Sequence, residues 1–149
     1  MGNALFYHLT RSPAESLLPV LIGKSLAAGW QVELRGTDPA RMERLDLHLW
    51  QAEGFLPHGL AGGPHDARQP VLLTVAGQGA ANRPACLMAL DGAEVAPDEC
   101  AAMERACILF DGGDAAATAR ARDQWRMLTG AGVAAEYWSE EGGRWERKR

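Results

Sequence analysis

The side chains best suited to bind a ligand lie in the last helix that the sequence predicts, residues 115–129. Five of them recur at helical spacing and share one face of that helix: Thr118, Arg122, Trp125, Arg126 and Thr129. The neighbouring stripe is predicted to pack on the sheet and consists of Ala117, Ala121, Gln124 and Leu128. Two arginines one turn apart can grip a carboxylate, and the neighbouring indole can receive an apolar side chain. The pattern predicts a pocket for an acidic peptide with an apolar end.

The same helix face also fits a purely structural interpretation. Asp123 and the two arginines would then form weak pairs in solvent, and Trp125 would be packed into the core. A third possibility is direct binding of a single nucleic-acid strand through Trp125 and a basic tail at residues 143–149. The sequence by itself is compatible with each of these alternatives.

A different function is suggested by two residues outside this helix. Asp111 directly follows a predicted buried strand, at the edge where α/β proteins place ligand-contacting residues, and His58 lies in a glycine-rich loop. Together they define the alternative of a small enzyme with its site at the carboxyl edge of the sheet. The structural interpretation is that Asp111 forms a turn, Asp114 caps the next helix and His58 orders its own loop.

Motifs for the common cofactors and nucleophiles are missing from the sequence. The dinucleotide-binding motif G-x-G-x-x-G does not follow the first predicted strand, and residues 77–82 are predicted to form a loop. The sequence also lacks the P-loop motif G-x-x-x-x-G-K-[ST] and the hydrolase motif G-x-S-x-G. His58 and His65 have no further metal ligands at a recognised spacing. We therefore predict no cofactor, no metal and no catalytic residue.

Length and composition indicate one globular domain over residues 1–149, with 47% hydrophobic and 23% charged residues. No apolar run approaches the roughly 20 residues of a membrane helix, and no secretory signal is visible, so we expect a cytoplasmic protein without a membrane partner. The net charge of −4 argues against binding of duplex DNA. Three cysteines without a C-x-x-C pair are expected to be free and buried.

Apolar runs and turn residues predict strands that alternate with helices. The predicted strands are residues 3–9, 30–34, 70–75, 86–90, 107–110 and 133–138, and the predicted helices are residues 14–28, 39–51, 98–105 and 115–129. Ser12 is the expected N-cap of the first helix, and strict alternation in residues 30–34 predicts a half-buried strand. The fold class is α/β, with a mostly parallel sheet between two layers of helices. The end of the basic tail, residues 145–149, is expected to be frayed.

A series of phrases spread along nearly the whole chain is distinctive in combination. The phrases are Phe6-Tyr7, L-x-x-x-L-W at residues 45–50, F-L-P-H-x-L-A-G at residues 55–62, P-V-L-L at residues 70–73, A-R-D-Q-W-R at residues 121–126, Gly132 and Tyr137-Trp138. In this combination the sequence resembles the family of the chi subunit of bacterial DNA polymerase III, a component of the clamp loader.

The resemblance implies a noncatalytic replication adaptor with a Rossmann-like α/β/α fold that lacks a nucleotide-binding loop. It implies binding of the acidic C-terminal tail of single-stranded-DNA-binding protein, with Arg122 and Arg126 on the carboxylates and Trp125 beside the apolar pocket. Thr118 and Thr129 occupy positions where better-known members have further basic residues, so a weaker electrostatic attraction for the acidic tail is expected. A psi subunit, where one is present, would tether the chain to the clamp loader through Trp50, Phe55, Leu56 and Pro57.

Overall fold

The computed structural model describes residues 2–51 and 56–149 of the chain. Its strands form one sheet in the order β3-β4-β2-β5-β6-β1-β7-β8, and every neighbouring pair is parallel except β7 with β8. The strands are β1 (Asn3–Leu9), β2 (Val32–Gly36), β3 (Gly59–Leu60), β4 (Val71–Val75), β5 (Cys86–Ala89), β6 (Arg105–Asp111), β7 (Ala134–Ser139) and β8 (Glu146–Arg147). The mostly parallel sheet confirms the predicted fold class.

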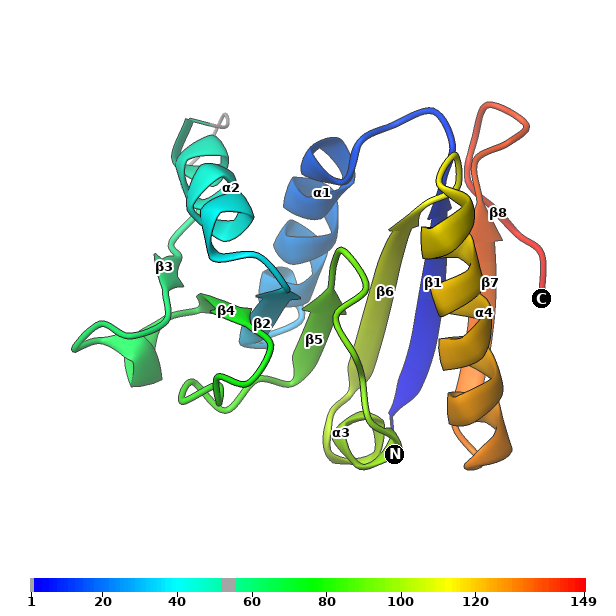
Figure 1. Cartoon of the computed structure of the whole chain (residues 1–149). Helices are drawn as coiled ribbons and strands as arrows, with labels where there is room; N and C mark the ends of the chain where they lie inside the picture. The colour runs from blue at the N-terminus through cyan, green and yellow to red at the C-terminus, as the bar shows by residue number, and fades with distance from the viewer. Residues whose placement is uncertain (1, 52–55) are drawn as a thin grey trace.

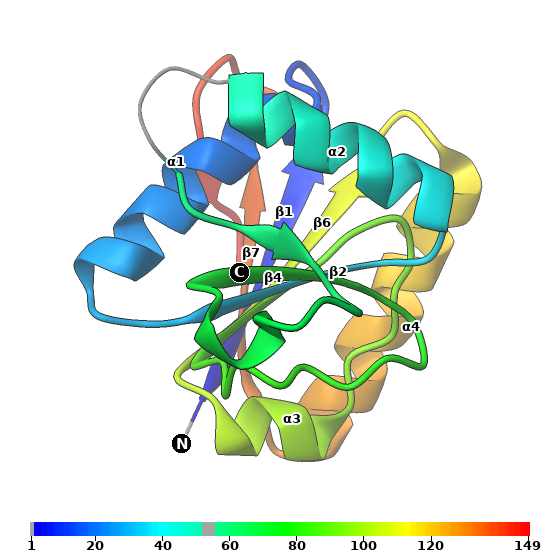
Figure 2. The same ribbon diagram turned by 90° about the vertical axis from the view of Figure 1, so that its left-hand side faces the viewer.

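Helices cover both faces of this sheet (Figures 1 and 2). The helices are α1 (Ala14–Ala27), α2 (Pro39–Gln51), α3 (Pro97–Ala102) and α4 (Ala115–Gly130), with a 3-10 turn at Asp66–Arg68. The first two pack on one face and the last two on the other. Because a crossover helix is needed between parallel strands, the alternation of apolar runs and helical patterns in the sequence leads directly to this three-layer arrangement.

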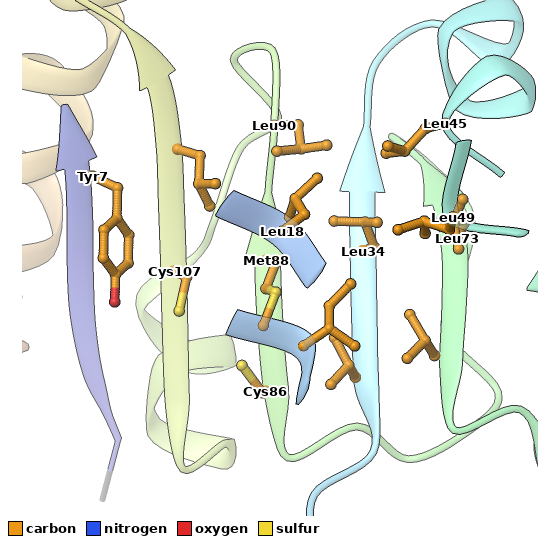
Figure 3. Close-up of a cluster of buried hydrophobic side chains, with 14 of the residues drawn as sticks. Tyr7, Leu18, Leu34, Leu45, Leu49, Leu73, Cys86, Met88, Leu90 and Cys107 are labelled. Atoms are coloured by element: carbon orange, nitrogen blue, oxygen red, sulfur yellow. The ribbon is translucent and has the colours of Figure 1, made fainter. Parts of the chain in front are cut away.

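The core under α1 and α2 is made of long aliphatic side chains from helices and strands (Figure 3). Leu18 of α1 and Leu45 and Leu49 of α2 lie against Leu34 and Met88 of the central strands, and all of them are fully buried. The three cysteines are free and buried, as the sequence predicted: Cys86, Cys100 and Cys107.

The core under α3 and α4 contains smaller side chains and a pair of aromatic rings. Ala121 and Leu128 of α4 are buried against the sheet, and Gln124 donates a hydrogen bond to the Val95 carbonyl at 2.6 Å. Trp125 of the same helix packs against Phe6 of β1. The inner stripe of α4 is therefore the one expected from the helical period, and the opposite side of the helix is left to solvent.

The start of α1 differs from the prediction that Ser12 caps it. The N-cap is Pro13, which makes no side-chain cap bond, and the Ser12 hydroxyl instead donates to Glu140 Oε2 at 3.0 Å. The Glu140 carboxylate also accepts the backbone amides of Thr10, Arg11 and Ser12. The capping prediction was wrong because a residue distant in the sequence competes for the same hydroxyl.

Three further expectations are corrected by the structure. The alternating strand is not half-buried: Glu33 of β2 is only 1% exposed, because Arg35 and the hydroxyl of Thr74 bind its carboxylate. The helix predicted at residues 98–105 ends at Ala102, and Arg105 already begins β6. The tail is not frayed throughout, because β8 pairs with the edge of β7.

Candidate functional site

The five residues singled out on the last helix lie on one exposed side of α4, which we call the α4 surface. Arg122, Arg126 and Thr129 are exposed, whereas Thr118 and Trp125 are half-buried. The helix begins at Asp114, whose carboxylate accepts the amides of Ala116 at 2.9 Å and of Ala117 at 3.3 Å. This confirms the predicted cap.

Trp125 is anchored on one side and open on the other. Its ring meets the buried ring of Phe6 edge-on, with centroids 5.2 Å apart, and meets the ring of Tyr137 at 6.1 Å and 76°. Edge-to-face contacts of this kind hold an aromatic ring in one orientation. Trp125 is therefore half-buried and held in one orientation, and the exposed Arg122 lies one helical turn before it on α4.

The two arginines of the α4 surface carry positive charge into solvent. Arg126 lies 3.7 Å from Asp123, but the two side chains are 76% and 79% exposed, so their attraction is strongly screened. In the part of the chain that the structure describes, Arg122 has no hydrogen bond or ion pair with another side chain. Both guanidiniums are consequently able to meet a carboxylate from another molecule.

The two threonines contribute less than the arginines. Thr118 Oγ1 donates to the Asp114 carbonyl at 3.1 Å, and Thr129 Oγ1 donates to the Trp125 carbonyl at 2.7 Å. Because each hydroxyl hydrogen is used within the helix, neither threonine offers a donor to an incoming anion. The positive field of the surface therefore comes from the guanidiniums.

Two residues of the sheet border this surface and were not singled out in the sequence. Tyr137 of β7 packs against Trp125, and its hydroxyl lies 3.0 Å from His8 Nδ1 on β1. His8 is stacked on Phe110 at 5.1 Å, beneath Gly112, where a Cβ atom would collide with the imidazole. Strand alternation places Tyr137 and Trp138 on opposite faces, but it does not show which ring meets α4.

A second exposed surface lies on α2 and the chain after it. Trp50 is 51% exposed and Leu47 is 60% exposed, while Leu56 and Pro57 are half-buried. Phe55, the remaining candidate for psi binding, lies outside the described residues. Figure 1 shows α2 and α4 at opposite ends of the sheet.

The buried side chain of His58 packs beneath Trp50 of this second surface. It is 3% exposed, with Nδ1 2.6 Å from the Leu56 carbonyl oxygen and Nε2 3.0 Å from the Asp46 carbonyl oxygen. The Trp50 ring lies over the imidazole, with centroids 4.2 Å apart. His58 therefore orders its own loop, in agreement with the structural interpretation.

A groove of about 1130 Å³ runs along the carboxyl edge of the sheet, and its lining includes Asp111 but not His58. Asp111 Oδ1 accepts a hydrogen bond from the Gly113 amide at 2.8 Å, and this bond stabilises the turn after β6. The enzyme alternative placed its site at this edge of the sheet near Asp111 and His58, and the groove contains the first of these residues but not the second.

Over residues 2–51 and 56–149, no cluster of three or more His, Cys, Asp or Glu side chains is placed to bind a metal ion. In the same ranges, none of the helices combines the length and the apolar character that crossing a membrane requires.

Comparison with known proteins gives one clear relationship. The model of the family described as DNA polymerase III chi subunit, HolC, matches residues 1–136, which is most of the chain. The match covers α1 to α4 and reaches into β7, so it contains the α4 surface and the exposed part of α2. A search of curated proteins found no match.

Proposed function

Because this chain belongs to the family of the DNA polymerase III chi subunit, we propose that it is a noncatalytic adaptor that binds the acidic C-terminal tail of single-stranded-DNA-binding protein. The α4 surface is the proposed binding site. The observation that carries the proposal is the exposure of Arg122 and Arg126, one helical turn apart, beside the open side of Trp125.

The chemistry of this surface matches an acidic chain end. A guanidinium donates two parallel hydrogen bonds to a carboxylate, and such charge-assisted bonds are stronger than neutral ones. Trp125 supplies an apolar surface whose orientation is fixed by Phe6 and Tyr137. The tail would place its carboxylates on Arg122 and Arg126 and its apolar side chain against the indole.

The same geometry explains why the contact is expected to be salt-sensitive. The guanidiniums are exposed, so dissolved ions screen their attraction for a carboxylate. The threonine hydroxyls of the α4 surface donate within the helix and add no positive charge. We therefore expect a weaker electrostatic attraction for the acidic tail than in family members that carry basic residues at those positions.

The exposed part of α2 is the proposed contact with the clamp loader, through a psi subunit where one is present. Trp50 and Leu47 provide exposed apolar area there, and aromatic residues are enriched where proteins bind each other. Its position at the other end of the sheet from α4 suits a link between two partners (Figure 1). Phe55, Leu56 and Pro57 remain predicted members of this contact.

Titration with a synthetic acidic peptide tests the proposed function. We expect binding of the tail peptide to weaken by about 1.5–3 kcal/mol in Arg122→Ala and in Arg126→Ala, if each loses a desolvated charge-assisted contact. Arg44→Ala is the matched control, because Arg44 is an exposed arginine on α2. Amidation of the peptide's terminal carboxylate is a second arm. Equal affinity for the free and the amidated peptide would contradict a pocket for the chain end.

A further inference from the structure

The last residues of the chain are held against the strand that borders the α4 surface. The Lys148 amide donates to the Tyr137 carbonyl at 2.6 Å, and the Tyr137 amide donates to the Arg149 carbonyl at 3.2 Å. The Arg149 amide lies 3.4 Å from the same Tyr137 carbonyl, so two residues oppose one residue of β7, as in a β-bulge. The backbone of Arg149 is thereby held beside that of Tyr137, and the Arg149 side chain is exposed.

Tyr137 connects this C-terminal segment to α4. Its ring contacts Trp125, and its hydroxyl is bonded to His8, so the phenol cannot swing away from the helix. Burial raises the pKa of Tyr137, the negative charge of Glu141 acts in the same direction, and the positive charges of Arg122 and Arg149 oppose them. Two guanidiniums from distant parts of the chain therefore act on the same ring.

We propose, on the premise of the function given above, that Arg149 and Tyr137 belong to the docking surface for the acidic tail. The rings of Trp125 and Tyr137 meet nearly at a right angle and form an aromatic corner, which Arg122 and Arg149 flank. An apolar side chain of the tail lies on the two rings, and carboxylates of the tail meet the flanking guanidiniums. The C-terminal segment in this way supplies the positive charge that Thr118 and Thr129 do not.

Glu141 opposes this arrangement from the end of β7. Its backbone carbonyl accepts hydrogen bonds from Arg11, and its side chain is exposed and close enough to act on Tyr137. A negative charge at this position repels an acidic peptide. The proposal consequently predicts opposite effects for removal of Glu141 and removal of Arg149.

The experiment measures anisotropy of a labelled acidic tail peptide titrated with full-length protein at low salt. Arg149→Gln is expected to weaken binding about threefold to tenfold, and Glu141→Gln to strengthen it about twofold, as for partly screened contacts. Arg144→Gln is the matched control, with the same change in net charge in the same C-terminal segment. Arg144 is 85% exposed and pairs only weakly with Glu146, 3.6 Å away, so we expect its replacement to leave affinity unchanged.

The outcomes separate this inference from the proposed function. Equal weakening by Arg149→Gln and Arg144→Gln would show a response to net charge alone and would overturn the inference. Loss of binding in Arg122→Ala with normal binding in Arg149→Gln would also overturn it, while the proposed function would stand. No binding of the peptide by the unmodified protein would overturn both.

Discussion

Replacing Glu140 by glutamine tests whether a single carboxylate fastens the β1–α1 connection to the end of β7. Glu140 is 4% exposed, and its Oε1 accepts the amides of Thr10, Arg11 and Ser12 at 3.1, 2.8 and 2.6 Å. The carbonyl oxygen of a glutamine can still accept the three amides, and its NH2 group would face the Ser12 hydroxyl, which can turn to accept a hydrogen bond. The three amide bonds nevertheless lose the assistance of a full negative charge.

The magnitude follows from the number and kind of these bonds. A hydrogen bond to a charged group contributes about 1.5–3 kcal/mol, and bonds that share one carboxylate are not additive. We therefore expect Glu140→Gln to lower the free energy of unfolding by about 3 kcal/mol at pH 7, which is a large fraction of the stability of a small domain.

The effect of this substitution should depend on pH. Burial alone would raise the pKa of Glu140, but hydrogen bonds from Ser12, Arg11 and Thr10 outweigh it and lower the pKa. A carboxyl group whose pKa is lower in the folded state stabilises the protein above its unfolded pKa, and that stabilisation is lost as the pH falls through the folded pKa. The difference between the glutamate and glutamine proteins is therefore complete at pH 7 and shrinks below the ordinary glutamate range, about pH 4.3.

Urea unfolding at pH 7 and at acid pH measures both expectations. Glu141→Gln is the matched control, because Glu141 is the exposed neighbour and its replacement should change stability by less than about 0.5 kcal/mol. A loss smaller than about 1 kcal/mol at pH 7 would refute the assigned role of the carboxylate. So would a loss of the same size at both pH values.

Three further substitutions follow from other contacts. Arg35→Ala should cost about 3–5 kcal/mol in urea unfolding, because it leaves the carboxylate of Glu33 buried without its cation, whereas Arg44→Ala on exposed α2 should cost almost nothing. Leu49→Ala should cost about 2–5 kcal/mol by the same assay, and a smaller loss would mean that the core under α2 closes the cavity. Gly112→Ala should displace His8 and lower the melting temperature; an unchanged melting temperature would contradict the close packing of His8 under this glycine.

Much of the architecture could be predicted because it depends on local patterns. Apolar runs predicted the buried strands, and the helical period identified the inner stripe of α4, with Ala121 and Leu128 on the sheet. Gly29 ends the first helix region with φ +83°, the conformation that favours glycine. Each of these features is decided by residues within a few positions of one another.

Errors arose where a distant residue changed the outcome. Alternation in β2 predicted an exposed Glu33, but Thr74 and Arg35 enclose its carboxylate. Serine is favoured at helix N-caps, but the hydroxyl and the amide of Ser12 both donate hydrogen bonds to the carboxylate of Glu140. Arg35 lies two residues from Glu33, but Thr74 and Glu140 are distant in the sequence from Glu33 and Ser12, so spacing does not reveal them as partners.

The candidate site shows the same division. The sequence by itself determined that Arg122, Trp125 and Arg126 lie on one side of a helix, because the helical repeat fixes that relation wherever the helix is placed. Only the tertiary structure decided that Tyr137 meets Trp125, because β7 must first join the sheet beside β1. It likewise decided that Arg149 lies beside Tyr137. The bonds that hold the C-terminal segment there join backbone groups, which every residue type other than proline carries, so the sequence does not reveal them.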